Sequence, residues 1–331
     1  MNNFKKIGLT ALAASLVSVS ANAGEISVSG GASLGTAGYS GNQITSSNEF
    51  TMGNQLTFSG SGELDNGLTV SVSFVLDQGD NELVDDESGN APFDSHHVKI
   101  SSDSLGTLTF YGEGGSTTTS MIDGSAAGDI WDKFDGLTVQ SDGLTNVDDV
   151  TATATPGTNS FYYSSPELME GLTFQAHYEP QTATEVAGTG FGVTYAGVEG
   201  LTLKFATADA TNATTALSGD NTVMYASYAY GPVTVSYSDM EHDLNEAAHD
   251  FEQTSYAVSY TVSDELSLTY GQEELTREGV ATSAEYSGIS AAYTTGGMTI
   301  SAGMWDGENM SFGTSSLEDA EKWTLGVSFA F

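Results

Sequence analysis

Two histidine-aspartate pairs lie close together in one polar stretch of this chain. His242 precedes Asp243, and His249 precedes Asp250 seven residues further on. Imidazole nitrogens and carboxylate oxygens together are able to hold a divalent metal ion, so the stretch is a candidate metal site. A solvated acidic loop accounts for the same residues without a ligand, and we favour that interpretation.

A second group of chemically active side chains surrounds Ser95, which follows Asp94 and precedes His96 and His97. These residue types serve in nucleophilic hydrolases, but no nucleophile-elbow motif accompanies them. The chain contains no cysteine, which excludes thiol chemistry, thiolate metal sites and disulfides. We therefore expect no enzymatic activity and no required cofactor. A barrel-embedded hydrolase acting through His97 is the alternative.

An acid-rich stretch between residues 79 and 93 carries oxygen ligands of the kind that Ca²⁺ prefers. The spacing does not match an EF-hand loop, so the stretch indicates at most a loosely bound ion, which could bridge subunits. The candidate ligands are Asp80, Glu82, Asp85 and Asp86.

The segment from Glu113 to Thr158 is the longest connection in the chain. It holds eight acids and a single cation, Lys133, and it opens with glycines that permit a sharp bend. Segments of this length without regular structure are usually functional. Three large apolar side chains, Ile130, Trp131 and Phe134, have helical spacing and predict a short amphipathic turn that holds the loop on a wall.

The net charge limits the partners of this protein. Residues 1–23 predict a secretory signal peptide, with two lysines, an apolar run from Ile7 to Val19 and small residues before the cleavage site. Its removal leaves residues 24–331 with five cations against 44 acids, a net charge of −39. So few cations exclude nucleic-acid binding. The acids either solvate a secreted protein or concentrate cations at a channel.

The elements that must position these residues are strands with a period of two. At the C-terminus, apolar residues from Trp323 to Phe331 alternate with Thr324, Gly326, Ser328 and Ala330. Such one-sided strands suit a closed barrel in lipid, where the apolar face meets acyl chains and the small polar face lines a lumen. No apolar run of about 20 residues follows the signal peptide, so no helical anchor is predicted.

Short turns alternate with long acidic loops along the chain, as in outer-membrane barrels. We predict an all-β fold, a 16-stranded antiparallel transmembrane β-barrel that contains a water-filled channel. The terminal strand pairs with the first. The strands are expected to begin near Glu25, Glu49, Leu68, Ser95, Thr107, Asn159, Leu172, Gly188, Leu201, Asp220, Val233, Phe251, Glu265, Ala281, Met298 and Ala320.

These features together resemble the general diffusion porins of Gram-negative bacteria, and most of all the Rhodobacter-type porins of alphaproteobacteria. The resemblance covers the whole chain and is most specific in the signal peptide, in the strand from Leu68 to Leu76 after Asp65-Asn66-Gly67, in residues 104–112 before the long segment, and in the terminal Phe331. It implies a homotrimer in the bacterial outer membrane, in contact with lipid and lipopolysaccharide. It also implies that the barrel-assembly machinery reads Phe331.

The resemblance further implies that the third loop folds inward as the pore constriction, with its acids facing a basic wall. The constriction candidates are Glu113, Asp123, Asp129, Asp132 and Asp135. Strand alternation places the candidate wall residues toward the lumen; they are His97, Lys99, His177, Lys204 and Lys322.

The basic half of the porin pattern is weak in this chain. We therefore predict passive diffusion of small hydrophilic solutes with marked cation selectivity, fading toward molar salt, where the screening length is about 3 Å. An adhesin or binding barrel is the alternative function. A barrel that never conducts would favour that alternative.

Overall fold

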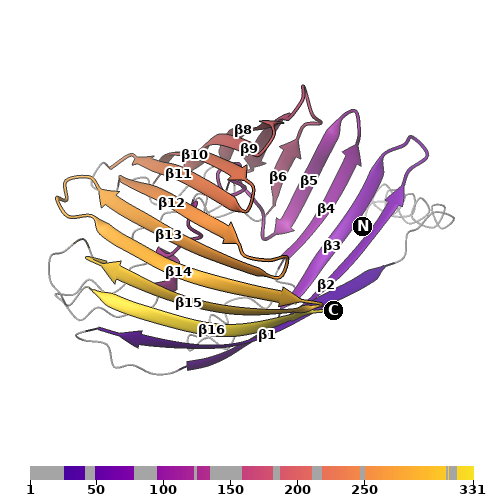
Figure 1. Ribbon diagram of the computed structural model, residues 1–331. Helices are drawn as coiled ribbons and strands as arrows, with labels where there is room; N and C mark the ends of the chain where they lie inside the picture. The colour runs from indigo at the N-terminus through magenta and orange to yellow at the C-terminus, as the bar shows by residue number, and fades with distance from the viewer. Residues whose placement is uncertain are drawn as a thin grey trace, which may run out of the picture.

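The computed structural model describes residues 26–41, 49–77, 95–122, 125–134, 159–181, 187–210, 218–246, 250–310, 312 and 319–331. The strands form one closed antiparallel barrel in which every strand pairs with its neighbours in sequence and β1 pairs with β16 (Figure 1). The fold class predicted from the sequence is confirmed. Within these residues, no helix is long and apolar enough to cross a membrane.

The strands are β1 (Ser27–Ser40), β2 (Glu49–Glu63), β3 (Thr69–Asp77), β4 (Ser95–Ser102), β5 (Gly106–Glu113), β6 (Ser160–Ser164), β7 (Leu172–Glu179), β8 (Gly188–Val198), β9 (Leu201–Ala210), β10 (Gly219–Tyr230), β11 (Val233–Leu244), β12 (Phe251–Thr261), β13 (Leu266–Arg277), β14 (Ala284–Thr295), β15 (Met298–Glu308) and β16 (Ala320–Ala330). One short 3₁₀ helix, η1 (Trp131–Phe134), lies in the loop after β5. The predicted strand starts are close to the observed ones, and the largest difference is Ala281 against Ala284.

The terminal strand closes the barrel. β16 pairs with β1 from Gly31 opposite Ala330 to Ser40 opposite Glu321. Beyond that register, Gly30 and Phe331 exchange backbone hydrogen bonds of 2.8 and 2.9 Å. The last residue of the chain is therefore part of the seam that removes the open edges of the sheet.

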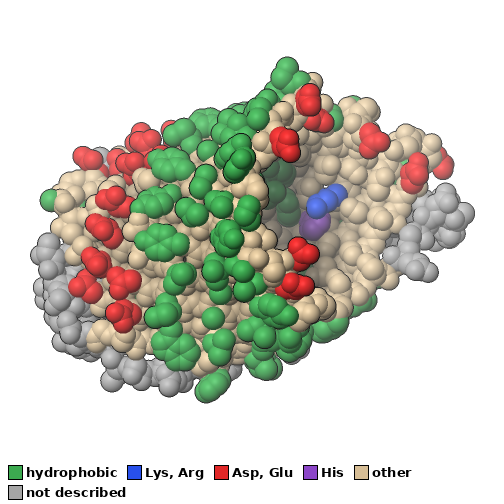
Figure 2. Space-filling view, viewed as in Figure 1, with side chains coloured by type: hydrophobic (Ala, Val, Ile, Leu, Met, Phe, Trp, Pro, Cys, Tyr) green, Lys and Arg blue, Asp and Glu red, His purple; other side chains and the backbone are tan. Residues whose placement is uncertain are grey.

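The two faces of each strand differ as the alternation predicts. Outward residues such as Ile100 and Leu325 are large, apolar and exposed. Figure 2 shows a green band of apolar side chains across the outer surface that faces the viewer. Inward residues are mostly Ser, Thr, Gly and Ala, which leave room for water in the lumen.

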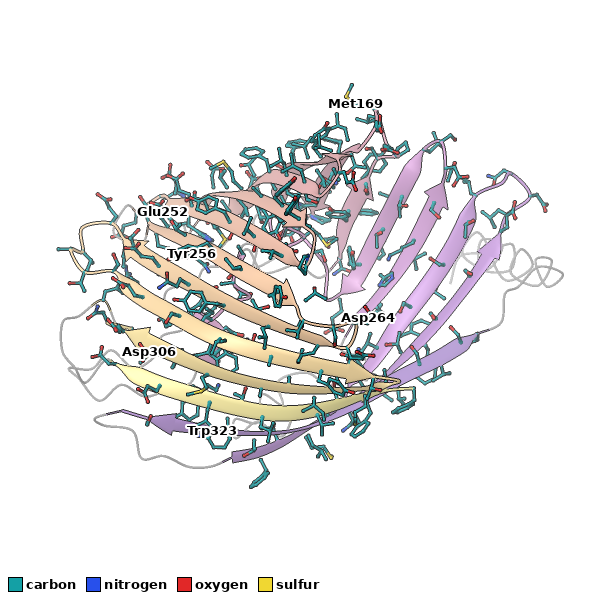
Figure 3. The ribbon with its side chains drawn as sticks, in the orientation of Figure 1. Met169, Glu252, Tyr256, Asp264, Asp306 and Trp323 are labelled. Carbon is teal, nitrogen blue, oxygen red and sulfur yellow. The ribbon has the colours of Figure 1, made fainter. Side chains whose placement is uncertain are left out.

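The two rims of the barrel carry different connections. One rim has short turns, such as Glu199-Gly200 between β8 and β9. Gly200 adopts φ +77° there, a conformation that is strained for residues with a side chain. Asp264 and Met169, labelled in Figure 3, lie in turns of this rim. The longer connections lie at the other rim, which we call the loop rim.

Candidate channel and constriction loop

The loop that follows β5 folds into the barrel, as predicted. We call residues 114–134 of this connection loop 3. Near the start of loop 3, the backbone N–H of Thr118 donates a 2.9 Å hydrogen bond to Nδ1 of His177 on β7. The Thr118 hydroxyl donates to the carbonyl oxygen of Thr207 on β9 at 3.2 Å. Ile122 then packs against Ala206 and Val223, on β9 and β10.

Inward serines hold the next part of loop 3. The backbone N–H of Ala126 donates to the Ser238 hydroxyl on β11 at 2.8 Å. The N–H of Ala127 donates to the Ser255 hydroxyl on β12 at 2.9 Å. The two serines are opposite one another in the strand register, so their hydroxyls form one continuous row of acceptors for the loop backbone.

A buried carboxylate continues this row on β13. Glu273 lies opposite Ser255, is 2% exposed, and accepts hydrogen bonds from the Ser125 hydroxyl and, at 3.0 Å, from the N–H of Trp131. Glu273 was not among the site residues predicted from the sequence, although its inward parity among small residues was a usable signal.

Loop 3 ends in an apolar cluster on the inner wall of β13–β16. Ile130 and Phe134 are buried there, and the Phe134 ring lies 5.8 Å from the ring of Tyr286. Trp131 packs at the edge of the cluster. Lys322 on β16 donates a hydrogen bond to the carbonyl oxygen of Lys133. The three apolar side chains that the sequence suggested as an attachment therefore all contact this wall.

The described part of loop 3 thus follows the inner wall from β7 to β16. The wall of β1–β4 keeps exposed small polar side chains facing inward, including Ser33, Thr51 and Gln55. Figure 2 shows the hollow interior, with a basic and a histidine side chain on an otherwise uncharged wall. Among the described residues, the space between loop 3 and β1–β4 is therefore lined by polar side chains, and we call it the open path.

The five candidate wall residues have different surroundings. His97 and Lys99 lie on β4, toward the open path, and the His97 ring is 5.6 Å from that of Tyr111. His177 faces inward but is buried under Thr118, so it is covered by loop 3.

The other two candidates, Lys204 and Lys322, each lie over a tyrosine ring. The Lys204 ammonium is 5.1 Å from the centroid of Tyr225, and that of Lys322 is 4.8 Å from the centroid of Tyr39. Both charges are held at the wall.

Three of the five candidate constriction acids, Glu113, Asp129 and Asp132, lie within the described residues. Glu113 ends β5, and its carboxylate is 3.9 Å from Nδ1 of His96. Asp132 is exposed on η1, and Asp129 is half-buried in the turn before it. Asp123, Asp135 and the Ca²⁺ candidates Asp80, Glu82, Asp85 and Asp86 lie outside the described residues. In the described part of the chain, no three His, Asp or Glu side chains form a group that could hold a metal ion.

His242 does not lie in a solvated loop, so the interpretation favoured from the sequence is wrong for this residue. It lies on β11, faces inward, is 1% exposed and stacks on the Phe251 ring at 4.0 Å. Its neighbours Glu241 and Asp243 face the opposite side of the strand. A metal site that combines His242 with these carboxylates is therefore excluded by the geometry.

The charges on the strands are divided between the two faces. The described strand cations, Lys99, Lys204, Arg277 and Lys322, all have inward parity. Most acids of β9–β16 have outward parity and lie toward the loop rim, above the apolar band (Figure 2); two of them, Glu252 and Asp306, are labelled in Figure 3. We call this group the outer acidic belt: Asp209, Asp220, Asp239, Glu241, Asp243, Glu252, Glu274, Glu285, Asp306, Glu308 and Glu321.

A closed barrel with an apolar outer band, a polar interior and an inward loop defines a channel-forming membrane protein of the porin class. The comparison with family models agrees. Residues 8–305 match the model of the Gram-negative porins, and the chain belongs to that family. The family and the fold together indicate an outer-membrane β-barrel protein.

Solved structures share the fold at low sequence identity. A porin refined at 1.8 Å resolution is 18% identical, with a TM-score of 0.63, and a five-substitution variant of Rh. blastica porin is 14% identical, with a TM-score of 0.64. An engineered protein described for asymmetric conductivity is 14% identical, with a TM-score of 0.65. Each comparison covers 93% of this chain and 100% of the other. No curated protein sequence matches this chain.

Proposed function

We propose that this porin is a passive, water-filled channel for small hydrophilic solutes, with loop 3 as its constriction. The observation that carries the proposal is the attachment of loop 3 along the inner wall from β7 to β16, which leaves a polar path beside β1–β4. Water and solutes pass such a path without a reaction or a cofactor.

We further propose that the channel prefers cations. Few cations face the lumen, and both Lys204 and Lys322 are held over tyrosine rings. Asp132 on η1 is exposed, and the connection that contains loop 3 carries eight acids against one lysine. The outer acidic belt contributes little, because it is separated from the channel by the barrel wall and by screening lengths of about 10 Å in 0.1 M salt.

Planar-bilayer recordings test both parts of the proposal. Refolded protein is expected to conduct, and reversal potentials in a salt gradient are expected to favour cations, with the preference fading toward molar salt. Anion preference would refute the selectivity. Deletion of residues 122–155 is expected to raise the conductance, and an unchanged conductance would refute the placement of the constriction. A barrel that never conducts would favour the adhesin alternative.

We also propose a homotrimer, as is typical of porins, in contact with lipopolysaccharide. The outer acidic belt supports this contact, because its carboxylates lie above the apolar band and divalent cations such as Ca²⁺ can bridge carboxylates to the phosphates of lipopolysaccharide. Removal of divalent cations with EDTA is expected to release bound lipopolysaccharide from the purified protein. Chemical crosslinking tests the trimer, and a monomer alone would contradict it.

A further inference from the structure

Glu273 is a buried carboxylate with a specific set of partners. It lies within β13, faces inward, and has Ser255 and Tyr286 opposite it on the neighbouring strands. Its two oxygens each accept one hydrogen bond from loop 3, from the Ser125 hydroxyl and from the Trp131 N–H. Among the described residues, no Lys, Arg or His side chain forms an ion pair with Glu273.

Burial of a carboxylate without a cation is costly unless hydrogen bonds compensate for the lost water. Here the compensating donors belong to loop 3. The Glu273 carboxylate therefore keeps these hydrogen bonds only while the loop lies on the wall. The Ser125 hydroxyl also accepts a 2.9 Å hydrogen bond from the backbone N–H of Asp129. The Ser125 side chain therefore links the carboxylate to a tight turn. The turn itself has positive φ angles at Gly128 and Asp129.

The wall around Glu273 is shaped for the same turn. Gly271, the next inward residue on β13, has no side chain, and a Cβ placed there would be 2.6 Å from the Cβ of Ala127. The neighbouring contacts through Ser238 and Ser255 are bonds between neutral groups. Charge-assisted hydrogen bonds are roughly twice as strong as neutral ones, so an ionised Glu273 makes the strongest polar contacts in this row.

We propose that Glu273 is a positioning residue, a buried anchor that fixes residues 125–131 of loop 3 against β11–β13 and so sets the width of the channel. The proposal rests on the proposed role of loop 3 as the constriction. It adds one side chain on the wall on which that role depends. This side chain is 148 residues beyond Ser125 and 142 residues beyond Trp131 in the sequence.

The test compares Glu273→Ala and Glu273→Gln with the same two substitutions at Glu274. Glu274 is the neighbouring residue on β13, has the same side chain, and faces outward and exposed. It therefore controls for the loss of a carboxylate from this strand. The glutamine variant retains the shape and one acceptor oxygen but removes the charge, so it separates the charge from the packing.

Limited trypsin digestion reports whether loop 3 is attached. Lys133 is the only Lys or Arg between residues 113 and 158, so release of the loop exposes one cleavage site. We expect Glu273→Ala to be cut at Lys133 about tenfold faster than wild type, which corresponds to about 1.4 kcal/mol in the opening equilibrium. Glu273→Gln is expected to be intermediate, and both Glu274 variants are expected to match wild type.

Single-channel recording of the same variants reports the width of the channel. A higher or noisier conductance is expected for Glu273→Ala, and wild-type traces for the Glu274 variants. Cleavage of Glu273→Ala at the wild-type rate would overturn the anchor. Fast cleavage with unchanged conductance would leave the attachment standing but overturn the loop as constriction, so the two failures are distinguishable.

A covalent tether guards against a variant that is simply misfolded. The Ser125 and Ser255 hydroxyl oxygens are 3.3 Å apart, and the chain has no cysteine of its own. Ser125→Cys with Ser255→Cys, introduced into Glu273→Ala, is expected to form a disulfide under oxidation. Oxidation is expected to restore trypsin resistance and wild-type conductance, and reduction to abolish both. Failure of the closed disulfide to restore either property would contradict the proposal.

Discussion

Lys99 and Glu274 provide a direct comparison between inward and outward charge. Lys99 lies on the inner face of β4, beside the open path, whereas Glu274 lies on the outer face of β13. Lys99→Gln and Glu274→Gln each change the net charge by one unit, in opposite directions. If the net charge set the selectivity, the two substitutions would have effects of similar size and opposite sign. The arrangement of the strands predicts very unequal effects.

The size of the Lys99 effect follows from its distance to a passing ion. At about 8 Å the ammonium interacts with an ion by about 0.5 kcal/mol in water, and 0.1 M salt reduces this to about 0.2 kcal/mol. The sign is opposite for cations and anions, so removal of the charge raises the cation-to-anion permeability ratio about twofold. For Glu274, at roughly 20 Å and two screening lengths, the ratio changes only about 1.1-fold.

The assay is the reversal potential of each variant across a planar bilayer in asymmetric salt. At 0.1 M the Lys99→Gln channel is expected to be the more cation-selective by about twofold, and at 1 M, where the screening length is about 3 Å, the difference is expected to vanish. Equal and opposite shifts for the two variants would refute the reasoning, because they would mean that the outer charges reach the channel as effectively as those on the wall.

Three further predictions concern loop attachment and closure. Phe134→Ala removes a ring with no exposed surface, which is expected to weaken attachment of loop 3 by about 3–5 kcal/mol and to increase open-channel noise. Gly271→Val is expected to displace the loop through its clash with Ala127 and to raise the conductance, whereas Gly60→Ala, which meets nothing closer than 3.8 Å, is expected to leave the conductance unchanged. Deletion of Phe331 removes both terminal seam hydrogen bonds and is expected to lower the yield of heat-modifiable folded barrel on gels; an unchanged yield would contradict its role in closure.

The sequence by itself determined the barrel. Alternation with a period of two is a local property of each strand, so the apolar and polar faces of Trp323 to Phe331 could be assigned without knowledge of the rest of the chain. The same parity gave the inward direction of His97, Lys99 and Lys204. Turn residues between the strands then predicted short connections, which alternate with long ones as in outer-membrane barrels with an even number of strands.

The positions of the acids and of His242 were predicted less well from the sequence. The net charge suggested that the acids could concentrate cations at a channel, yet strand alternation places acids such as Glu252 and Asp306 on the outer face of the barrel. His242 was assigned to a solvated loop because its neighbours are acidic. In the fold those neighbours face outward, and the histidine lies buried against Phe251.

Only the tertiary structure decided where loop 3 lies. Loop residues have no periodicity that assigns them a face, and the groups that hold them are far away in sequence. Glu273 contacts Ser125 and Trp131 only after barrel closure brings β7–β16 around the loop. The same closure buries His177 beneath Thr118. The sequence sets the faces of a strand because side-chain direction is local. It does not set the partners of the loop, because those contacts depend on the closed barrel.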